Sequence, residues 1–591
     1  MLRMKAQTDT KTTVVVPSNP YPYPGLLSDP SAIRLVVLLP SVEKHADIVC
    51  VLCNGALSRS ESDQYEALSY VWGDSLKRRP ITVSNQQFQA TENLELALRH
   101  LRQRDRPRVL WIDSLCINQN DVAESNAKVQ QLDRIYKSAQ KVVVWLGPES
   151  DTSGDAFDFL RDQPRPDPAN TDDRYHELYW TTFASSLLAF HRLLQRAWFT
   201  RVWCIQEFIL GQRVVFQCGQ HRVSLEDFES MFYLMVDADT SRGFIETFRG
   251  QGPRMREEFA EYSPRATRLF NCKRGLFRVV ESVLGLLSEF REWASSDPRD
   301  LIFAFYGLVS AQNPLRDALQ PDYSLNVAKV YIRVAVQCLQ EHRDLDLLPI
   351  TTQPVHGFVD ISRVRYLPCW VPDWRDAQRF GVEVHYRSIA FHGLGTHIFT
   401  FDTMYNAVLG LKADTLGFQD DNQILCLDGI NVDAIDDIGD IYMGHNQTKT
   451  SAADVLLQWK DIAGLSTEHC YKYTGEPVRE AFWRTVLLDE QLDMRMGVGK
   501  LPFRYRIPPK DAKLDWLQYF PPTAQDDLEF MMKATAISGP MIGRRFFKTT
   551  RGLFGLAPAS AQKGDRVVVL FGGKAPFVIR DFRWYQVIGE W

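Results

Sequence analysis

Short, continuously apolar segments alternate with segments of helical spacing over the first 220 residues, and this alternation constrains the fold more than any other feature. The run KVVVWL at 141–146 has no polar face, which is typical of a strand in a sheet covered on both sides. Leucines at helical spacing in 93–101 predict one of the intervening helices. Since strands that alternate with helices pair in parallel, we expect an α/β domain with a mostly parallel sheet and helices on both faces. Further strands are expected at 33–39, 48–53, 67–71, 109–112 and 214–218.

The rest of the chain divides by composition and spacing. Residues 1–30 are polar and Pro-rich and predict a disordered tail. Gly572 and Gly573, between two apolar runs near the end, indicate a hairpin of a small barrel or curled sheet. The predicted order is a tail at 1–30, the α/β domain at 31–222, a helical region at 223–345, a mixed α/β region at 346–535 and a small β module at 536–591.

Charge and cysteine usage narrow the class of protein. The 68 basic and 73 acidic residues give a net charge of -5, which argues against a nucleic-acid partner because phosphate binding needs an excess of cations. No apolar stretch reaches the roughly 18 residues of a membrane span, and the first residues lack the apolar core of a secretory signal. The ten cysteines are scattered, and the apolar flanks of Cys50 and Cys53 favour a buried strand over zinc binding. We expect a cytoplasmic protein without a structural metal.

Three segments occur in a fixed order: YEALSYVWGD (65–74), LWIDSLCINQND (110–121) and RAWFTRVWCIQEF (196–208). In these segments the chain resembles the fungal heterokaryon incompatibility (HET) domain family, and the resemblance continues through SDPRD at 296–300. It implies non-self recognition and regulated cell death, with protein partners in incompatibility signalling and a homo-oligomer as further expectations. The chain departs from the family at 124–128, where ESNAK replaces the usual Glu-Arg-Asn-x-Gln.

The HET family in turn resembles TIR domains distantly, which implies a TIR/flavodoxin-like fold for 31–222. Trp203 and Glu207 in WCIQE match the TIR motif of a tryptophan followed four residues later by a glutamate. Enzymatic TIR domains cleave NAD with that glutamate. The resemblance therefore implies that Glu207 is the catalytic residue of an NAD glycohydrolase, with NAD as substrate and no cofactor.

The residues support this site independently. Ligands of open parallel sheets bind beyond the carboxyl ends of the strands, where polar residues follow the segments ending at Val71 and Ile112. Helical geometry places Glu207 away from the apolar stripe of its helix, so we expect it outside the core. A carboxylate there can stabilise positive charge at the anomeric carbon as nicotinamide leaves. The expected substrate-binding residues are Tyr70, Trp72, Gly73, Asp74, Asp113 and Trp203.

Other interpretations of the same residues remain open. Glu207 fits a solvated carboxylate, or one paired with Arg201 or Arg196, and Asp113 fits a loop cap. A second class of function is a signalling and self-assembly module that acts by protein contacts without turnover, favoured by the lack of a complete catalytic constellation. A third is a divergent, inactive member, suggested by Ser125 and Lys128 in the ESNAK departure.

Overall fold

The computed structural model describes most of the first 348 residues and parts of the remainder. The described residues are 31–57, 65–162, 184–236, 268–275, 282–348, 366–375, 411–442, 452–465, 470–486, 490–493, 503–506, 543–581 and 585–590, with positions 23, 25, 265, 266, 364, 407 and 541. The predicted tail at 1–30, apart from two positions, and much of the predicted mixed region at 346–535 lie outside these residues.

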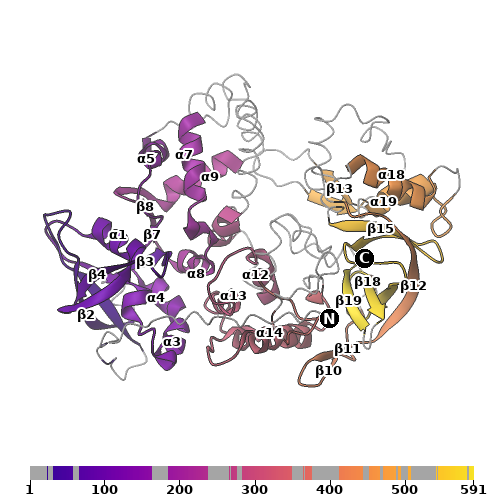
Figure 1. Ribbon diagram of the computed structural model, residues 1–591, viewed down its shortest axis with the longest axis horizontal. Helices are drawn as coiled ribbons and strands as arrows, with labels where there is room; N and C mark the ends of the chain where they lie inside the picture. Colours follow the sequence, from indigo (N-terminus) through magenta and orange to yellow (C-terminus); the bar gives the residue numbers. More distant parts are fainter. Residues whose placement is uncertain are drawn as a thin grey trace, which may run out of the picture.

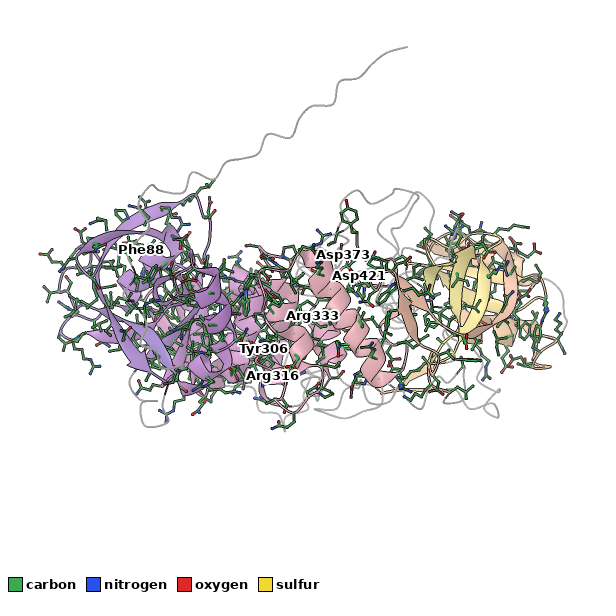
Figure 2. The ribbon with its side chains drawn as sticks, turned by 90° about the horizontal axis from the view of Figure 1, so that it is seen from below. Phe88, Tyr306, Arg316, Arg333, Asp373 and Asp421 are labelled. Atoms are coloured by element: carbon green, nitrogen blue, oxygen red, sulfur yellow. The ribbon has the colours of Figure 1, made fainter. Side chains whose placement is uncertain are left out.

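The parts of the chain follow one another along the long axis of the molecule (Figure 1). An α/β part lies at one end, helices occupy the middle, and a curled sheet lies at the other end. A perpendicular view keeps this order, with Phe88 in the α/β part and Arg333 on a central helix (Figure 2). The α/β part, the central helices and several residues of the C-terminal sheet share one continuous apolar core.

A nine-stranded mixed sheet organises the α/β part. Its order is β5-β4-β2-β1-β6-β3-β7-β8-β9, and β6, β3, β7 and β8 at its centre run parallel. The flanking strands add four antiparallel pairings, so the sheet is mixed where a mostly parallel one was expected. Its strands are β1 (Ala32–Leu38), β2 (Val49–Ala56), β3 (Glu66–Tyr70), β4 (Arg78–Val83), β5 (Gln86–Thr91), β6 (Arg108–Trp111), β7 (Lys141–Trp145), β8 (Val214–Cys218) and β9 (His221–Ser224).

The central strands are held by burial of apolar side chains on both faces. Val142, Val143 and Val144 of β7 are fully buried, and each such side chain contributes roughly 1.5–3 kcal/mol relative to an exposed one. The predicted strands at 33–39, 67–71 and 109–112 are confirmed as β1, β3 and β6 within one residue at each end.

The hairpin of β4 and β5 was not predicted. Ser84 and Asn85 join its strands and both have positive φ, at 47° and 63°, the conformation of a two-residue hairpin turn that follows the sheet's twist. The two strands contain few apolar residues, because the RRP and QQ segments are exposed. The alternation of apolar and polar residues that predicts a strand is therefore missing.

Helices connect and cover the strands of this part. They are α1 (Glu92–Leu101), α2 (Asp113–Cys116), α3 (Val122–Val129), α4 (Leu132–Ser138), α5 (Ser153–Asp162), α7 (Ala184–Leu194), the 3₁₀ turn η2 (Ala197–Thr200), α8 (Val202–Leu210) and α9 (Leu225–Val236). Helix α8 packs on β3, β7 and α4 and ends at Gly211. Thr200 does not cap α8, because its hydroxyl donates to the Ala197 carbonyl and Arg201 occupies the cap position.

Helices α12 (Val283–Glu289), α13 (Asp300–Phe303), η5 (Arg316–Leu319) and α14 (Val327–His342) form the middle of the molecule. The Asn326 side chain caps α14 by accepting from the backbone N–H of Lys329 at 2.9 Å. Arg316 lies over the Tyr306 ring, 4.5 Å from its centroid, and both are seen together at the α/β side of the middle (Figure 2). The Arg316 guanidinium also approaches the Asp133 carboxylate of α4 at 3.9 Å, which links this region to the α/β part.

The C-terminal sheet is antiparallel and strongly curved. Its order is β16-β15-β12-β17-β18-β19, and the edge strands β16 and β19 approach each other. Two bulges in β12 bend it between its partners. The strands are β12 (Gly429–Ile438), β15 (Arg544–Thr549), β16 (Phe554–Pro558), β17 (Arg566–Leu570), β18 (Phe577–Asp581) and β19 (Tyr585–Glu590), so one central strand comes from outside the predicted module at 536–591.

Smaller elements surround this sheet. They are β10 (Gly417–Gln419), β11 (Ile424–Cys426), β13 (Glu490–Asp493), β14 (Phe503–Arg506), α18 (Ala452–Ala463) and α19 (Val478–Val486). The hairpin expected at Gly572 and Gly573 is present between β17 and β18, with a six-residue connection in place of a tight turn.

Candidate functional site

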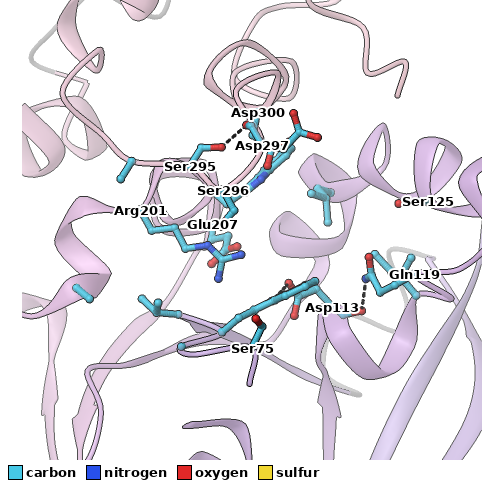
Figure 3. A pocket seen from close by; sticks show the side chains of 18 of the residues that line it. Ser75, Asp113, Gln119, Ser125, Arg201, Glu207, Ser295, Ser296, Asp297 and Asp300 are labelled. Carbon is cyan, nitrogen blue, oxygen red and sulfur yellow. Dashed lines mark hydrogen bonds between the residues drawn. The ribbon is translucent and has the colours of Figure 1, made fainter. Parts of the chain in front are cut away.

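A cavity of about 800 Å³ opens beyond the carboxyl ends of β3 and β6 (Figure 3). Parallel strands place their following loops at one edge of a sheet, which brings Trp72 and Asp113 together. The α/β part supplies one wall and the segment at 294–300 supplies the other. The lining residues are Val71, Trp72, Gly73, Ser75, Asp113, Ile117, Gln119, Val122, Ser125, Leu132, Tyr136, Ala197, Thr200, Arg201, Trp203, Glu207, Ala294, Ser295, Ser296, Asp297, Asp300 and Tyr323.

Glu207 reaches the cavity from α8 and is held by a neutral donor. The Ser69 hydroxyl donates to its Oε2 at 2.5 Å, and the nearby Tyr136 hydroxyl, which donates to the Leu68 carbonyl at 3.4 Å, also favours the charged form of the carboxyl group. Ser69 in turn accepts from the Trp198 indole at 2.8 Å, so its hydroxyl proton is directed at the carboxylate. The resulting chain of bonds fixes the position of the Glu207 oxygens.

The environment of Glu207 favours its protonated form more than water does. Burial raises its pKa from the usual 4.5 to about 7, although Ser69 opposes the shift by donating to the charged form. Asp113 adds a further rise, and Arg201 opposes it. Near neutral pH the group is thus divided between acid and carboxylate, as suits a residue that handles charge in a reaction.

The expectation that Glu207 lies outside the core is wrong, because only 8% of it is exposed. Helix α8 is covered on both faces, so its polar side does not meet solvent. The segment from the middle region docks there: the Val202 N–H donates to the Ala294 carbonyl at 3.0 Å, and the Gly307 N–H donates to the Gln206 side chain at 3.2 Å. The helical periodicity of α8 does not indicate that a segment from much later in the chain, around residues 294–307, also covers the helix.

Asp113 and Arg201 form the wall next to the strand ends. Asp113 accepts from the Trp72 indole at 2.8 Å and from the Ser114 N–H at 2.7 Å, and burial raises its pKa. Arg201 donates to the Tyr70 carbonyl at 2.9 Å, and its guanidinium lies over the Trp72 ring, 5.4 Å from the centroid. Arg201 and Glu207 are seen on the same side of the cavity (Figure 3).

The opposite wall carries two further carboxylates. The Tyr323 hydroxyl donates to Asp300 at 2.6 Å, and the nearby Trp203 indole also favours the charged form of Asp300. Burial raises the pKa of Asp300 to about 6. Asp297 instead pairs with Arg299, whose guanidinium approaches to 2.6 Å. The cavity therefore holds carboxylates on both walls (Figure 3).

The structure brings most of the predicted site residues together and leaves two aside. Trp72, Gly73, Asp113, Trp203 and Glu207 all line the cavity. Tyr70 and Asp74, which were also expected to bind substrate, do not line it.

The reasons lie in local geometry. The Tyr70 side chain is buried, and its hydroxyl hydrogen-bonds the Ser114 hydroxyl at 2.6 Å. Asp74 turns back to its own loop, where it accepts from the Leu76 N–H at 2.9 Å. Neither side chain lines this cavity, and their role in binding substrate stays a prediction.

Sequence reasoning missed several residues of the site. Ser69, Tyr136, Asp300 and Tyr323 were not singled out, although Asp300 belongs to the SDPRD run that carried part of the family resemblance. Arg201 was considered solely as an alternative partner of Glu207. A useful signal was available for Ser69, a polar residue within the otherwise apolar run ALSYV.

The ESNAK departure is accommodated without local damage. It lies in α3, where Glu124 pairs with Arg34 at 2.5 Å and Lys128 donates to the Ala32 carbonyl at 2.5 Å. Ser125 lines the cavity. The departure thus changes the chemistry of the lining and leaves the packing of α3 intact.

Two other kinds of feature do not occur in the described ranges. No group of three or more His, Cys, Asp or Glu residues there is arranged to hold a metal ion. Within the same ranges, no helix combines the length and apolar character of a membrane span.

Two segments of the chain match families of known proteins. Residues 65–207 match the family of the heterokaryon incompatibility protein (HET), and residues 507–590 match the Het-6 β-barrel domain. The first match confirms the resemblance of the three sequence segments to the HET family. It is 26% identical over 683 aligned positions to heterokaryon incompatibility protein 6, OR allele, of Neurospora crassa, covering 97% of this chain and 94% of that protein. No solved structure matches the chain.

Proposed function

We propose that this chain acts in heterokaryon incompatibility, in non-self recognition leading to regulated cell death, and that its cavity cleaves NAD. Two comparisons support the biological role: the HET match and the similarity to heterokaryon incompatibility protein 6 along nearly the whole chain. The name of that relative refers to incompatibility and to no chemical reaction.

One observation carries the chemical half of the proposal: Glu207 is a buried carboxylate with a pKa of about 7, held by Ser69 at the wall of a cavity. In the proposed reaction the bond between ribose C1′ and the nicotinamide nitrogen breaks, and its electron pair leaves with nicotinamide. Ionised Glu207 stabilises the positive charge that develops on C1′ and the ring oxygen. Water then adds to C1′ and loses a proton, which gives ADP-ribose.

The test is nicotinamide release by the full-length protein, measured at high protein concentration with NAD. We expect Glu207→Gln to reduce the rate by at least a hundredfold, because Gln keeps the shape and loses the charge that stabilises the transition state. A matched control is Glu341→Gln, which makes the same change at an exposed position of α14 and should leave the rate unchanged.

Equal nicotinamide release by the wild type and Glu207→Gln would contradict the enzymatic half. In that case the non-enzymatic proposal remains, in which the chain signals through protein contacts and self-assembly. The buried Ser69–Glu207 bond also fits a purely structural role, so a Glu207→Gln chain that keeps the death phenotype would favour this alternative.

A further inference from the structure

The charges that face the cavity are strongly unbalanced. Among the described residues of its lining, four are carboxylates, Asp113, Glu207, Asp297 and Asp300, and one, Arg201, is a cation. Such a surface attracts a positively charged ligand and offers a pyrophosphate few partners. A dinucleotide in this cavity therefore gains affinity from the part of it that carries positive charge.

The lining also provides aromatic surfaces for a planar ring. Trp72, Trp203, Tyr136 and Tyr323 all border the cavity. Aromatic faces attract cations through the ring quadrupole, as the position of Arg201 over Trp72 already shows. Carboxylates combined with aromatic walls are suited to a flat organic cation.

Asp300 differs from the other acidic residue on its wall. Asp297 is neutralised by Arg299, while Asp300 is held by the neutral hydroxyl of Tyr323. In the part of the chain that the structure describes, no ion pair satisfies Asp300 directly. Its charge is therefore available to a ligand in the cavity.

We propose that Asp300, supplied by the segment beyond the HET match, selects the oxidised, positively charged nicotinamide ring over the uncharged dihydronicotinamide ring. The proposal rests on the proposed function, since it takes a nicotinamide dinucleotide as the ligand, and it assigns the specificity for that ligand to a residue outside 65–207. The cavity then distinguishes the two redox forms by the charge of the nicotinamide ring, because both forms carry the same pyrophosphate and adenosine.

Equilibrium binding to the full-length protein tests this separately from turnover. The two probes are carba-NAD, which is cationic and cannot be hydrolysed, and NADH, titrated by calorimetry at pH 7.5. We expect the wild type to bind carba-NAD about tenfold more tightly than NADH, as a nearby unit charge in a partly buried site provides. Asp300→Asn should bring this ratio close to one while leaving the affinity for NADH nearly unchanged.

The matched control is Asp322→Asn, next to Tyr323 in sequence. The Asp322 carboxylate accepts from the Ser324 N–H and hydroxyl within its own turn and does not line the cavity. Its removal makes the same change in net charge, so the ratio should stay at the wild-type value. If Asp300→Asn disturbs the structure of the site, the affinity for both ligands should fall equally. If it removes the selection alone, only the affinity for carba-NAD should fall.

Three outcomes would overturn the proposal: equal affinity of the wild type for both probes, binding of neither, or an unchanged ratio in Asp300→Asn. Failure of the proposed function looks different. If carba-NAD binds preferentially and NAD is not cleaved, the selection by Asp300 stands and the enzymatic proposal falls. If NAD is cleaved and the two probes bind equally, the reverse holds.

Discussion

Glu207 shows how much a single residue depends on its surroundings. A buried carboxylate with a pKa raised from 4.5 to about 7 costs the folded state about 3 kcal/mol once it ionises. This is a large share of the stability of an ordinary domain. An acid kept at such a position is typical of sites where chemistry rather than packing decides the residue.

The cost of ionising Glu207 predicts that the free energy of unfolding depends on pH. Because the folded pKa lies above the unfolded one, the Glu207 carboxyl group favours the folded state below about pH 4.5, and this contribution is lost as the pH rises through about 7. Glu207→Gln has no such titration. We expect the variant to be more stable than the wild type at pH 8, by up to about 3 kcal/mol, with a much smaller difference at pH 5.

Urea denaturation at both pH values measures the effect, with the exposed Glu341→Gln as the control. Identical differences between Glu207→Gln and the wild type at pH 5 and pH 8 would show that the carboxyl group is not held in a raised-pKa environment. The comparison is independent of any ligand or activity.

At the scale of elements, the sequence predicted the parts of the site better than their surroundings. The apolar runs ending at Val71 and Ile112 marked β3 and β6, and parallel pairing placed Trp72 and Asp113 at one edge. The burial of Glu207 could not be predicted, since its cover is the segment around Ala294, whose docking depends on contacts distant in sequence. Local periodicity describes one helix and one interface at a time.

Helix α8 ends where it touches β7. A Cβ on Gly211 would lie 2.5 Å from Val142 Cγ2 and 3.1 Å from Val142 Cβ, although Gly211 has an ordinary φ of -61°. We expect Gly211→Ala to lower the free energy of unfolding by about 1–3 kcal/mol, because neither a buried valine nor the strand can move aside freely. Chemical denaturation checks this.

Gly154→Ala serves as the control for that change. A Cβ on Gly154, in α5, would lie 3.6 Å from His221 in ordinary contact, so the substitution should be nearly neutral or slightly stabilising. If Gly211→Ala is equally harmless, α8 does not rest on β7 as closely as described.

At the scale of the whole molecule, the C-terminal sheet is attached to the end of α14 through a glycine. The Leu345 N–H donates to the Gly572 carbonyl at 3.0 Å, and Lys574 pairs with Asp346 at 2.6 Å nearby. Gly572 has a φ of 91°, and a Cβ there would lie 2.9 Å from the Cβ of Ala413. The glycine is needed both for its conformation and for the close contact.

We expect Gly572→Ala to loosen this attachment, so that limited proteolysis cuts between the middle helices and the sheet faster than in the wild type. Gly564→Ala separates the two causes, because Gly564 has nearly the same φ, 92°, and no atom within 4 Å of its Cβ position. Equal proteolysis of the two variants would mean that backbone strain alone, and not the contact with Ala413, accounts for the effect.

The cavity draws one wall from Glu207 and another from Tyr323, 116 positions later in the chain. At 5–20 residues per second, a ribosome needs on the order of ten seconds to pass from the first to the second. During that interval a nascent chain carries the glutamate without the pocket around it. Under the proposed function, the chain would therefore be inactive while it is still on the ribosome, since the pocket forms only after the second wall has been synthesised.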